Sequence, residues 1–69
     1  MYSIRVQCHN GVTYHSGNYR TLKEARIKLF DSVIGVPKKL WSIISNDKIV
    51  NHTCSGDNTY SVVPLKRMI

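Results

Sequence analysis

The chain has 69 residues, which is enough for one domain and too few for a second. Hydrophobic residues make up 42% and charged residues 20%, a composition that excludes a disordered chain, and no apolar run approaches the roughly 20 residues of a membrane-spanning helix. Lys and Arg number 10 against 4 Asp and Glu, so the formal charge of +6 favours partners that carry negative charge. The first residues show no secretory signal pattern, so we expect a single domain over 1–69 that stays in the cytoplasm.

The N-terminal part predicts a β-hairpin. Apolar and polar residues alternate over 2–8, and the His-Asn-Gly run at 9–11 predicts a turn into a second strand. A two-residue turn would pair Cys8 with Thr13 and send the apolar residues of the two strands to opposite faces. A three-residue loop with a left-handed glycine pairs Cys8 with Val12 and keeps them on one face. Because the buried face sets the register of a hairpin, we prefer the three-residue loop.

A helix is predicted over 22–34. Thr21 and Glu24 have the spacing of a capping box, in which each side chain accepts from the backbone amide of the other residue. At the far end, Gly35 suits the left-handed position after a helix, and Pro37 prevents continuation.

The predicted helix carries two neighbouring apolar stripes. The first consists of Leu22, Ala25, Leu29 and Val33, the second of Ile27, Phe30 and Ile34, with Arg26 between them. Our preferred interpretation is one wide core face, from which Arg26 extends along its aliphatic stem to water. The alternative leaves the Ile27 and Phe30 edge exposed as a contact patch.

Three further strands are expected after the helix. Residues 40–45 form the first of them, and a tight turn at 46–47 pairs Ile44 with Ile49, Ile43 with Val50 and Trp41 with His52. A second turn at 55–58 leads into a last strand over 59–63, which Pro64 ends. The chain therefore predicts an α+β fold: a single antiparallel sheet in the order β-β-α-β-β-β, with one helix packed across one face.

Little in the sequence indicates catalysis or a metal site. Cys8-His9 and His52-x-Cys54 lack the C-x2–4-C spacing of structural zinc sites. We expect both cysteines to be reduced thiols buried in the core, a disulfide between them being the alternative. The four carboxylates belong to a helix cap, an exposed helix face and two turns: Glu24, Asp31, Asp47 and Asp57. With no nucleophile elbow and no phosphate-cradling loop, we expect a protein that is not an enzyme and has no metal or cofactor.

The basic residues gather near the ends of the predicted helix, together with two aromatic residues. We select the following as the partner-binding residues: Tyr19, Arg20, Lys23, Arg26, Lys38, Lys39 and Trp41; Lys66 and Arg67 add charge in the tail. Charges in such a set speed encounter with an acidic surface, and aromatic side chains supply contact area. The same set suits phosphates and bases, and the simplest alternative is ordinary surface charge.

Two resemblances bear on function. Residues 17–25 (GNYRTLKEA) resemble the Gly-x-aromatic-x-Thr-x-x-Glu-Ala strand-to-helix junction of AP2-type DNA-binding domains. That family places three strands with base-reading Arg and Trp before its helix, whereas two strands precede it here and Trp41 follows it, so no base-reading residue is assigned. In length and composition the whole chain resembles the small accessory proteins of bacteriophages, which implies binding to a host enzyme or defence complex in the host cytoplasm.

These observations give one leading hypothesis and two alternatives. We expect a small inhibitor or modulator that binds a host protein with an acidic or nucleic-acid-binding surface. The first alternative is a non-specific binder of DNA or RNA that uses the same basic residues. The second is a homodimer formed through a free edge strand near Val62, with Tyr60 and Phe30 contributing.

Overall fold

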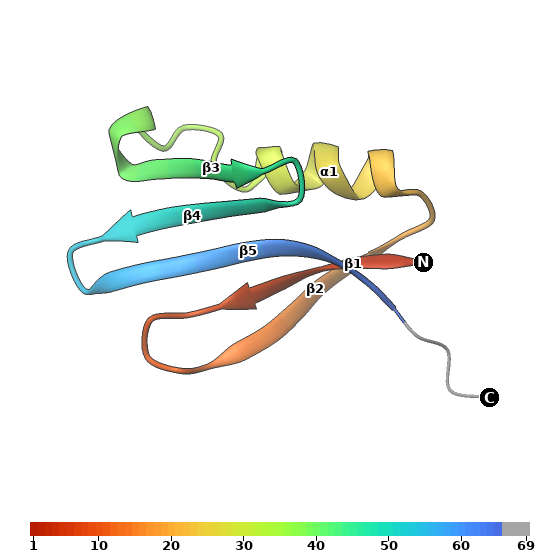
Figure 1. Cartoon of the computed structure of the whole chain (residues 1–69), viewed down its shortest axis with the longest axis horizontal. Helices are drawn as coiled ribbons and strands as arrows, with labels where there is room; N and C mark the ends of the chain where they lie inside the picture. Colours follow the sequence, from red (N-terminus) through yellow and green to blue (C-terminus); the bar gives the residue numbers. More distant parts are fainter. Residues whose placement is uncertain (66–69) are drawn as a thin grey trace.

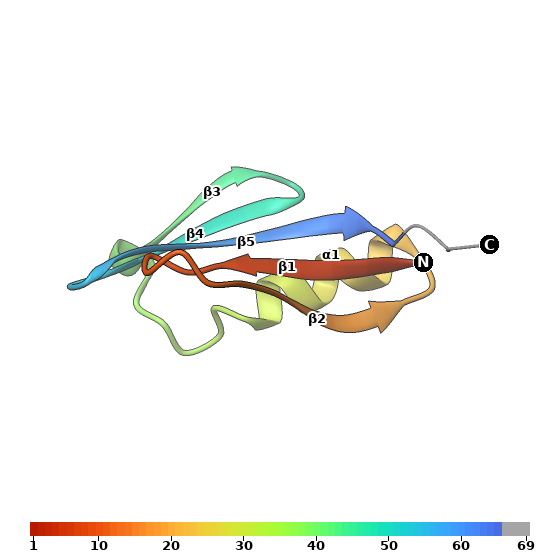
Figure 2. The same cartoon turned by 90° about the horizontal axis from the view of Figure 1, so that it is seen from below.

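The computed structural model describes residues 1–65. The chain forms, in order, β1 (Tyr2–Gln7), β2 (Thr13–Tyr19), α1 (Leu22–Asp31), a 3₁₀ turn η1 (Lys38–Leu40), β3 (Trp41–Ser45), β4 (Lys48–Thr53) and β5 (Gly56–Pro64). The strands make one antiparallel sheet in the order β2-β1-β5-β4-β3. α1 lies across one face of this sheet (Figure 1, Figure 2). The predicted α+β architecture is confirmed.

The first hairpin has the three-residue loop that the apolar pattern favoured. Val6 pairs with Tyr14, the Cys8 N–H donates to the Val12 carbonyl at 2.8 Å, and Gly11 has a φ of 91°. A left-handed residue at this position is what closes such a loop, and glycine adopts it without a Cβ penalty.

The helix begins where the capping box predicts and ends earlier than predicted. Thr21 Oγ1 accepts from the Glu24 N–H at 3.1 Å, whereas the last helical residue is Asp31 rather than Ile34. Beyond it the N–H groups of Val33 and Ile34 bond three residues back, each at 3.2 Å. These tighter turns replace the final α-helical turn. They still place Val33 in the core, with 5% of its surface exposed.

The register of the β3–β4 hairpin differs from the predicted one. Ile43, not Ile44, pairs with Ile49, and a bulge at Ile44 absorbs the extra residue. Residues at even spacing along a strand share a face, so this register puts Trp41 on the helix side together with Ile43. Trp41 packs against the core there and donates its indole N–H to the Val36 carbonyl at 3.1 Å. We attribute this change of register to the packing of Trp41 against the core.

The last hairpin also turns earlier than predicted. Thr53 pairs with Gly56, so the turn consists of residues 54–55, and β5 begins at Gly56 rather than at residue 59. Consequently Cys54 is exposed in a turn, which corrects the expectation that it lies in the core, whereas Cys8 is half-buried and packs against the core. Both thiols are free, as expected.

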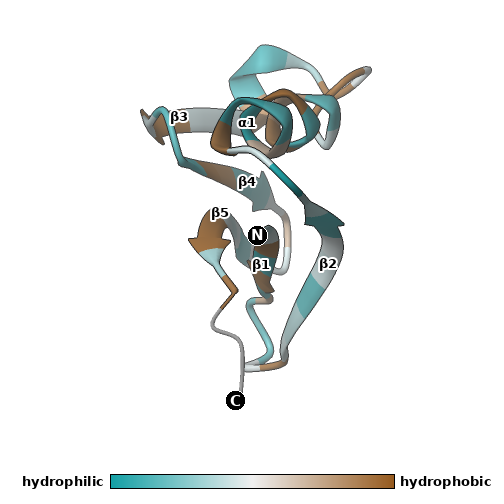
Figure 3. Ribbon diagram, turned by 90° about the vertical axis from the view of Figure 1, so that its right-hand side faces the viewer, coloured by the Kyte–Doolittle hydropathy of each residue, from teal (hydrophilic) through white to brown (hydrophobic). Residues whose placement is uncertain are grey.

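The core lies between α1 and the middle of the sheet. It consists of Ile4, Val6, Leu29, Val33 and Ile49, with Cys8, Tyr19, Val36, Trp41, Tyr60 and Val62 packed around it. The first helical stripe is buried through Ala25, Leu29 and Val33, as expected. The second is not: Ile27, Phe30 and Ile34 remain exposed, so the preferred interpretation of one wide core face is wrong. Seen along its long axis, the twisted sheet carries the helix on one side only (Figure 3).

The strand order also corrects the expected edge. β5, which contains Val62, lies in the centre of the sheet between β1 and β4, so it offers no free edge for a homodimer. The edges are β2 and β3. Within residues 1–65, no helix is long and apolar enough to cross a membrane.

Candidate binding surfaces

The residues predicted to bind a partner, apart from Arg26 in the middle of the helix, form two groups at opposite ends of α1 (Figure 1). Arg20 and Lys23 are exposed where the helix begins, and Tyr19 precedes them at the end of β2. Lys38 and Lys39 are exposed in η1, which leads into Trp41. The selected residues therefore do not make one continuous patch, and Lys66 and Arg67 lie outside the described residues.

Arg26 is engaged within the chain. Its Nε donates to Asp47 Oδ1 at 2.5 Å and its Nη2 to Oδ2 at 3.4 Å. The guanidinium therefore forms a bidentate ion pair with a carboxylate in the turn between β3 and β4. This hydrogen bonding holds the pKa of Asp47 below its ordinary value. Arg26 thus ties the helix to the sheet edge that the helix does not cover.

Trp41 is also partly committed to the fold. The indole N–H is bonded to the Val36 carbonyl, and the Lys38 ammonium lies 5.8 Å from the ring centroid. A cation at this distance is attracted by the face of the ring. Trp41 and Lys38 therefore stabilise the segment before β3, while Lys39 extends to water.

The outer side of the helix is the most apolar exposed surface of α1. We define the helix stripe as Ile27 and Phe30 on α1 together with Ile34 in the turns just after it, whose exposed fractions are 53%, 39% and 75%. Lys23 stands one turn before Ile27 on the same side. The stripe is exposed because the opposite side of α1, with Ala25 and Leu29, faces the sheet.

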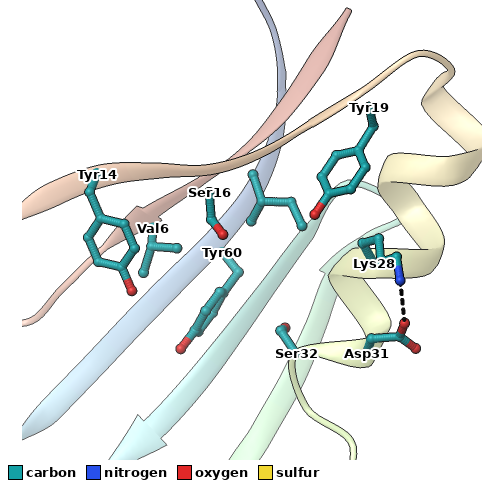
Figure 4. Close-up of a pocket in the computed structure, with 9 residues that line it drawn as sticks. Val6, Tyr14, Ser16, Tyr19, Lys28, Asp31, Ser32 and Tyr60 are labelled. Atoms are coloured by element: carbon teal, nitrogen blue, oxygen red, sulfur yellow. Dashed lines mark ion pairs between the residues drawn. The ribbon is translucent and has the colours of Figure 1, made fainter.

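A groove of about 300 Å³ lies on the other side of the helix, between α1 and the strands β1 and β2. Ile4 and Val6 form its floor, and the rings of three tyrosines turn into it (Figure 4): Tyr14, Tyr19 and Tyr60. On the helix it is bounded by the Lys28–Asp31 ion pair, with Nζ and Oδ2 3.8 Å apart. Burial raises the pKa of the Tyr60 hydroxyl. The groove thus has an apolar floor and a hydroxyl-rich rim.

The sheet face opposite α1, which we call the open face, carries the basic residues that sequence reasoning missed. Residues paired across antiparallel strands share a face, so one transverse row contains His15, Arg5, Ser61 and Lys48. The next row contains Thr13, Gln7, Thr59, Val50 and Ser42. The polar alternation of each strand signals an exposed face. Only the strand order shows that Arg5 and Lys48 flank the same serine.

At one end of the open face, three polar side chains are hydrogen-bonded in series. Ser42 Oγ and His52 Nε2 are 2.9 Å apart, and His52 Nδ1 is 2.9 Å from Asp57 Oδ1. This connectivity occurs in hydrolase triads, which also need oxyanion donors and a water-excluding site. Here the side chains of His52 and Asp57 are 42% and 59% exposed on an open sheet. We therefore interpret the series as a link between β3, β4 and β5.

Within residues 1–65, no group of three or more His, Cys, Asp or Glu is placed to hold a metal ion. In the comparisons with known proteins, the chain matches no protein-family model, no curated protein and no solved structure.

Proposed function

We propose that this chain is a non-enzymatic protein-binding module, an inhibitor or modulator of the bacteriophage accessory kind, that docks the outer side of α1 onto another protein in the cytoplasm. The observation that carries the proposal is the helix stripe. Ile27 and Phe30 on α1, and Ile34 in the turns just after it, expose apolar surface close together in the chain, and exposed apolar patches of this kind mark interaction surfaces.

The surface has the features of a helix that enters a groove. Ile27 and Phe30 have the i, i+3 spacing by which an amphipathic helix anchors itself in a partner, and Ile34 adds apolar surface just beyond the last helical residue, Asp31. The opposite side of α1 is fixed to the core through Ala25 and Leu29. A rigid helix loses little conformational entropy on binding, so the buried apolar area contributes more fully to affinity.

Charge indicates the kind of partner. Lys23 adjoins the helix stripe, and Lys38 and Lys39 follow its far end, so an apolar groove rimmed by acidic residues would be complementary. Two copies of a chain with a formal charge of +6 repel each other, which disfavours a homodimer through the same stripe. The free thiols of Cys8 and Cys54 accord with a reducing compartment.

The experiment is affinity capture from bacterial lysate after nuclease treatment, with three baits compared by quantitative mass spectrometry. The baits are the wild type, the stripe variant Ile27→Ser/Ile34→Ser, and a matched variant Ile43→Ser/Ile44→Ser that removes two exposed isoleucines from β3. We expect one stoichiometric protein to be retained by the wild type and the β3 variant and lost by the stripe variant.

Two results of this capture experiment would contradict the proposal. Equal loss with both variants would mean general stickiness of exposed isoleucine, and retention by the stripe variant would place the contact elsewhere. Light scattering coupled to size exclusion adds an independent check. A dimer that forms in the wild type and disappears in the stripe variant would identify a second copy as the occupant.

A further inference from the structure

The open face of the sheet differs from the helix side in chemistry and in the partner it suits. Two residues with full positive charge, Arg5 and Lys48, flank Ser61 on the three central strands, and His15 adjoins Arg5 on β2. Both cations are exposed, and no ion pair engages either within residues 1–65. Arg26 and Lys28, in contrast, are paired with carboxylates on the helix side.

Carboxylates are scarce on this face. Among the side chains that the strand registers place on this face within residues 1–65, Asp57 is the one acid. It lies at the beginning of β5, away from Arg5 and Lys48, and is hydrogen-bonded to His52. The row next to the cations presents hydroxyl and amide groups from Thr13, Gln7 and Thr59, followed by Val50 and by Ser42, whose hydroxyl is bonded to His52. The face therefore combines unpaired positive charge with neutral donors, which is the chemistry of phosphate contacts.

The spacing of the cations fits a duplex. Neighbouring strands lie about 4.8 Å apart, so the Cα atoms of Arg5 and Lys48, two strands from each other, are separated by roughly 10 Å. The grooves of B-form DNA are about 6 Å and 12 Å wide, so two long basic side chains at this separation reach phosphates on both sides of a groove. Ser61 lies between these two residues, and because its small side chain is nearly buried it keeps the surface between Arg5 and Lys48 low.

The open face also lacks what single strands need. The registers place on it no aromatic residue from residues 1–65, and base stacking on aromatic rings is the main attraction of single-strand binders. The aromatic side chains of the sheet lie on the helix side instead, as Tyr14 and Tyr60 do in the groove of Figure 4.

From these features we propose that the open face binds duplex DNA through its phosphates, without reading sequence, by means of Arg5 and Lys48. This surface shares no residue with the helix stripe. The two proposals therefore stand or fall separately.

The test is fluorescence anisotropy of a labelled 20-base-pair duplex (about two helical turns), titrated with protein between about 50 and 200 mM salt. Arg5→Gln/Lys48→Gln is compared with Arg20→Gln/Lys23→Gln, which removes the same charge from the start of α1. We expect the open-face variant to bind at least tenfold more weakly. Its log–log salt slope should be shallower by about 2, since each phosphate contact contributes about 0.9. The α1 variant should keep nearly all of the wild-type slope.

Two further arms separate the outcomes. Arg5→Lys should retain most of the binding, because it keeps the charge, and circular dichroism should show each variant folded. Single-stranded DNA should bind more weakly than the duplex, and duplex RNA of equal length reports whether the shared phosphate chemistry suffices. Equal losses in both double variants, tighter binding of single strands, or no duplex binding by the wild type at 50 mM salt would overturn the proposal.

Discussion

The division of α1 into a buried and an exposed stripe predicts very different costs for two substitutions. Leu29 is fully buried, so Leu29→Ala should destabilise the fold by about 2–5 kcal/mol, the range for Leu-to-Ala changes in packed cores. Ile34 is 75% exposed. Because only a quarter of it is covered, and full burial of an Ile side chain contributes about 1.5–3 kcal/mol, Ile34→Ser should cost about 0.4–0.8 kcal/mol.

Compared with the free energy of unfolding of the whole chain, the cost of Leu29→Ala is large and that of Ile34→Ser is small. A protein of this length is stable by about 3–10 kcal/mol at 0.05–0.15 kcal/mol per residue, so Leu29→Ala removes a large share or unfolds it. Urea denaturation measures the difference, followed by the fluorescence of the single tryptophan, Trp41, and by circular dichroism. With a slope near 1 kcal/mol per molar urea, we expect midpoint shifts of about 2 M or more for Leu29→Ala and under 1 M for Ile34→Ser.

Two results would refute this reasoning. If Ile34→Ser costs as much as Leu29→Ala, the helix stripe is covered in solution. If Leu29→Ala costs under about 1 kcal/mol, the helix does not pack on the sheet in the way described.

Three more predictions follow from single contacts. Pairing with Arg26 lowers the pKa of Asp47 in the folded chain, so on acidification the unfolded chain protonates Asp47 at a higher pH than the folded chain does. The stabilisation by this pair is therefore complete above the ordinary Asp pKa of about 4 and is lost as the pH falls through the lowered pKa. Thermal melts from pH 7 to 2 should show that loss, and Asp47→Asn should show less of it. Thr21→Ala removes the helix cap and should cost about 1 kcal/mol in urea titrations, whereas Thr21→Ser should cost little. Gly17→Ala should lower the melting temperature by several degrees, because Gly17 has a φ of 75° and a Cβ there would also meet the Tyr19 side chain. An unchanged melting temperature would contradict the left-handed backbone at this position.

Local chemistry made part of the fold predictable from the sequence. The helix start followed from Thr21 and Glu24, and the first loop from the need to keep apolar residues on one face. Both depend on residues that are close in the chain. The β3–β4 register did not follow, because it is fixed by the burial of Trp41 against the Val36 segment, a tertiary contact that outweighs the simplest turn.

The candidate surfaces were harder to predict because they depend on strand order. Whether Ile27 and Phe30 were buried depended on where α1 crosses the sheet, and α1 lies away from β3. Arg5 and Lys48 are far apart in the chain and flank the same residue, Ser61, only because β5 lies between β1 and β4. The distribution of charge along the sequence instead indicated the basic residues near the two ends of the helix.

The central pairing of β1 with β5 also determines how this domain relates to any chain joined to it. Tyr2 pairs with Pro64, and the Leu65 N–H donates to the Met1 carbonyl at 2.9 Å, so the chain enters and leaves the sheet side by side at one end of its central strands. A short linker could therefore join the two ends while new ends are opened in the turn at residues 54–55, giving a circular permutant with the same sheet. For the same reason the domain could be inserted into a surface loop of another protein without forcing the host's ends apart. During synthesis, the centre of the sheet stays open until β5 has emerged.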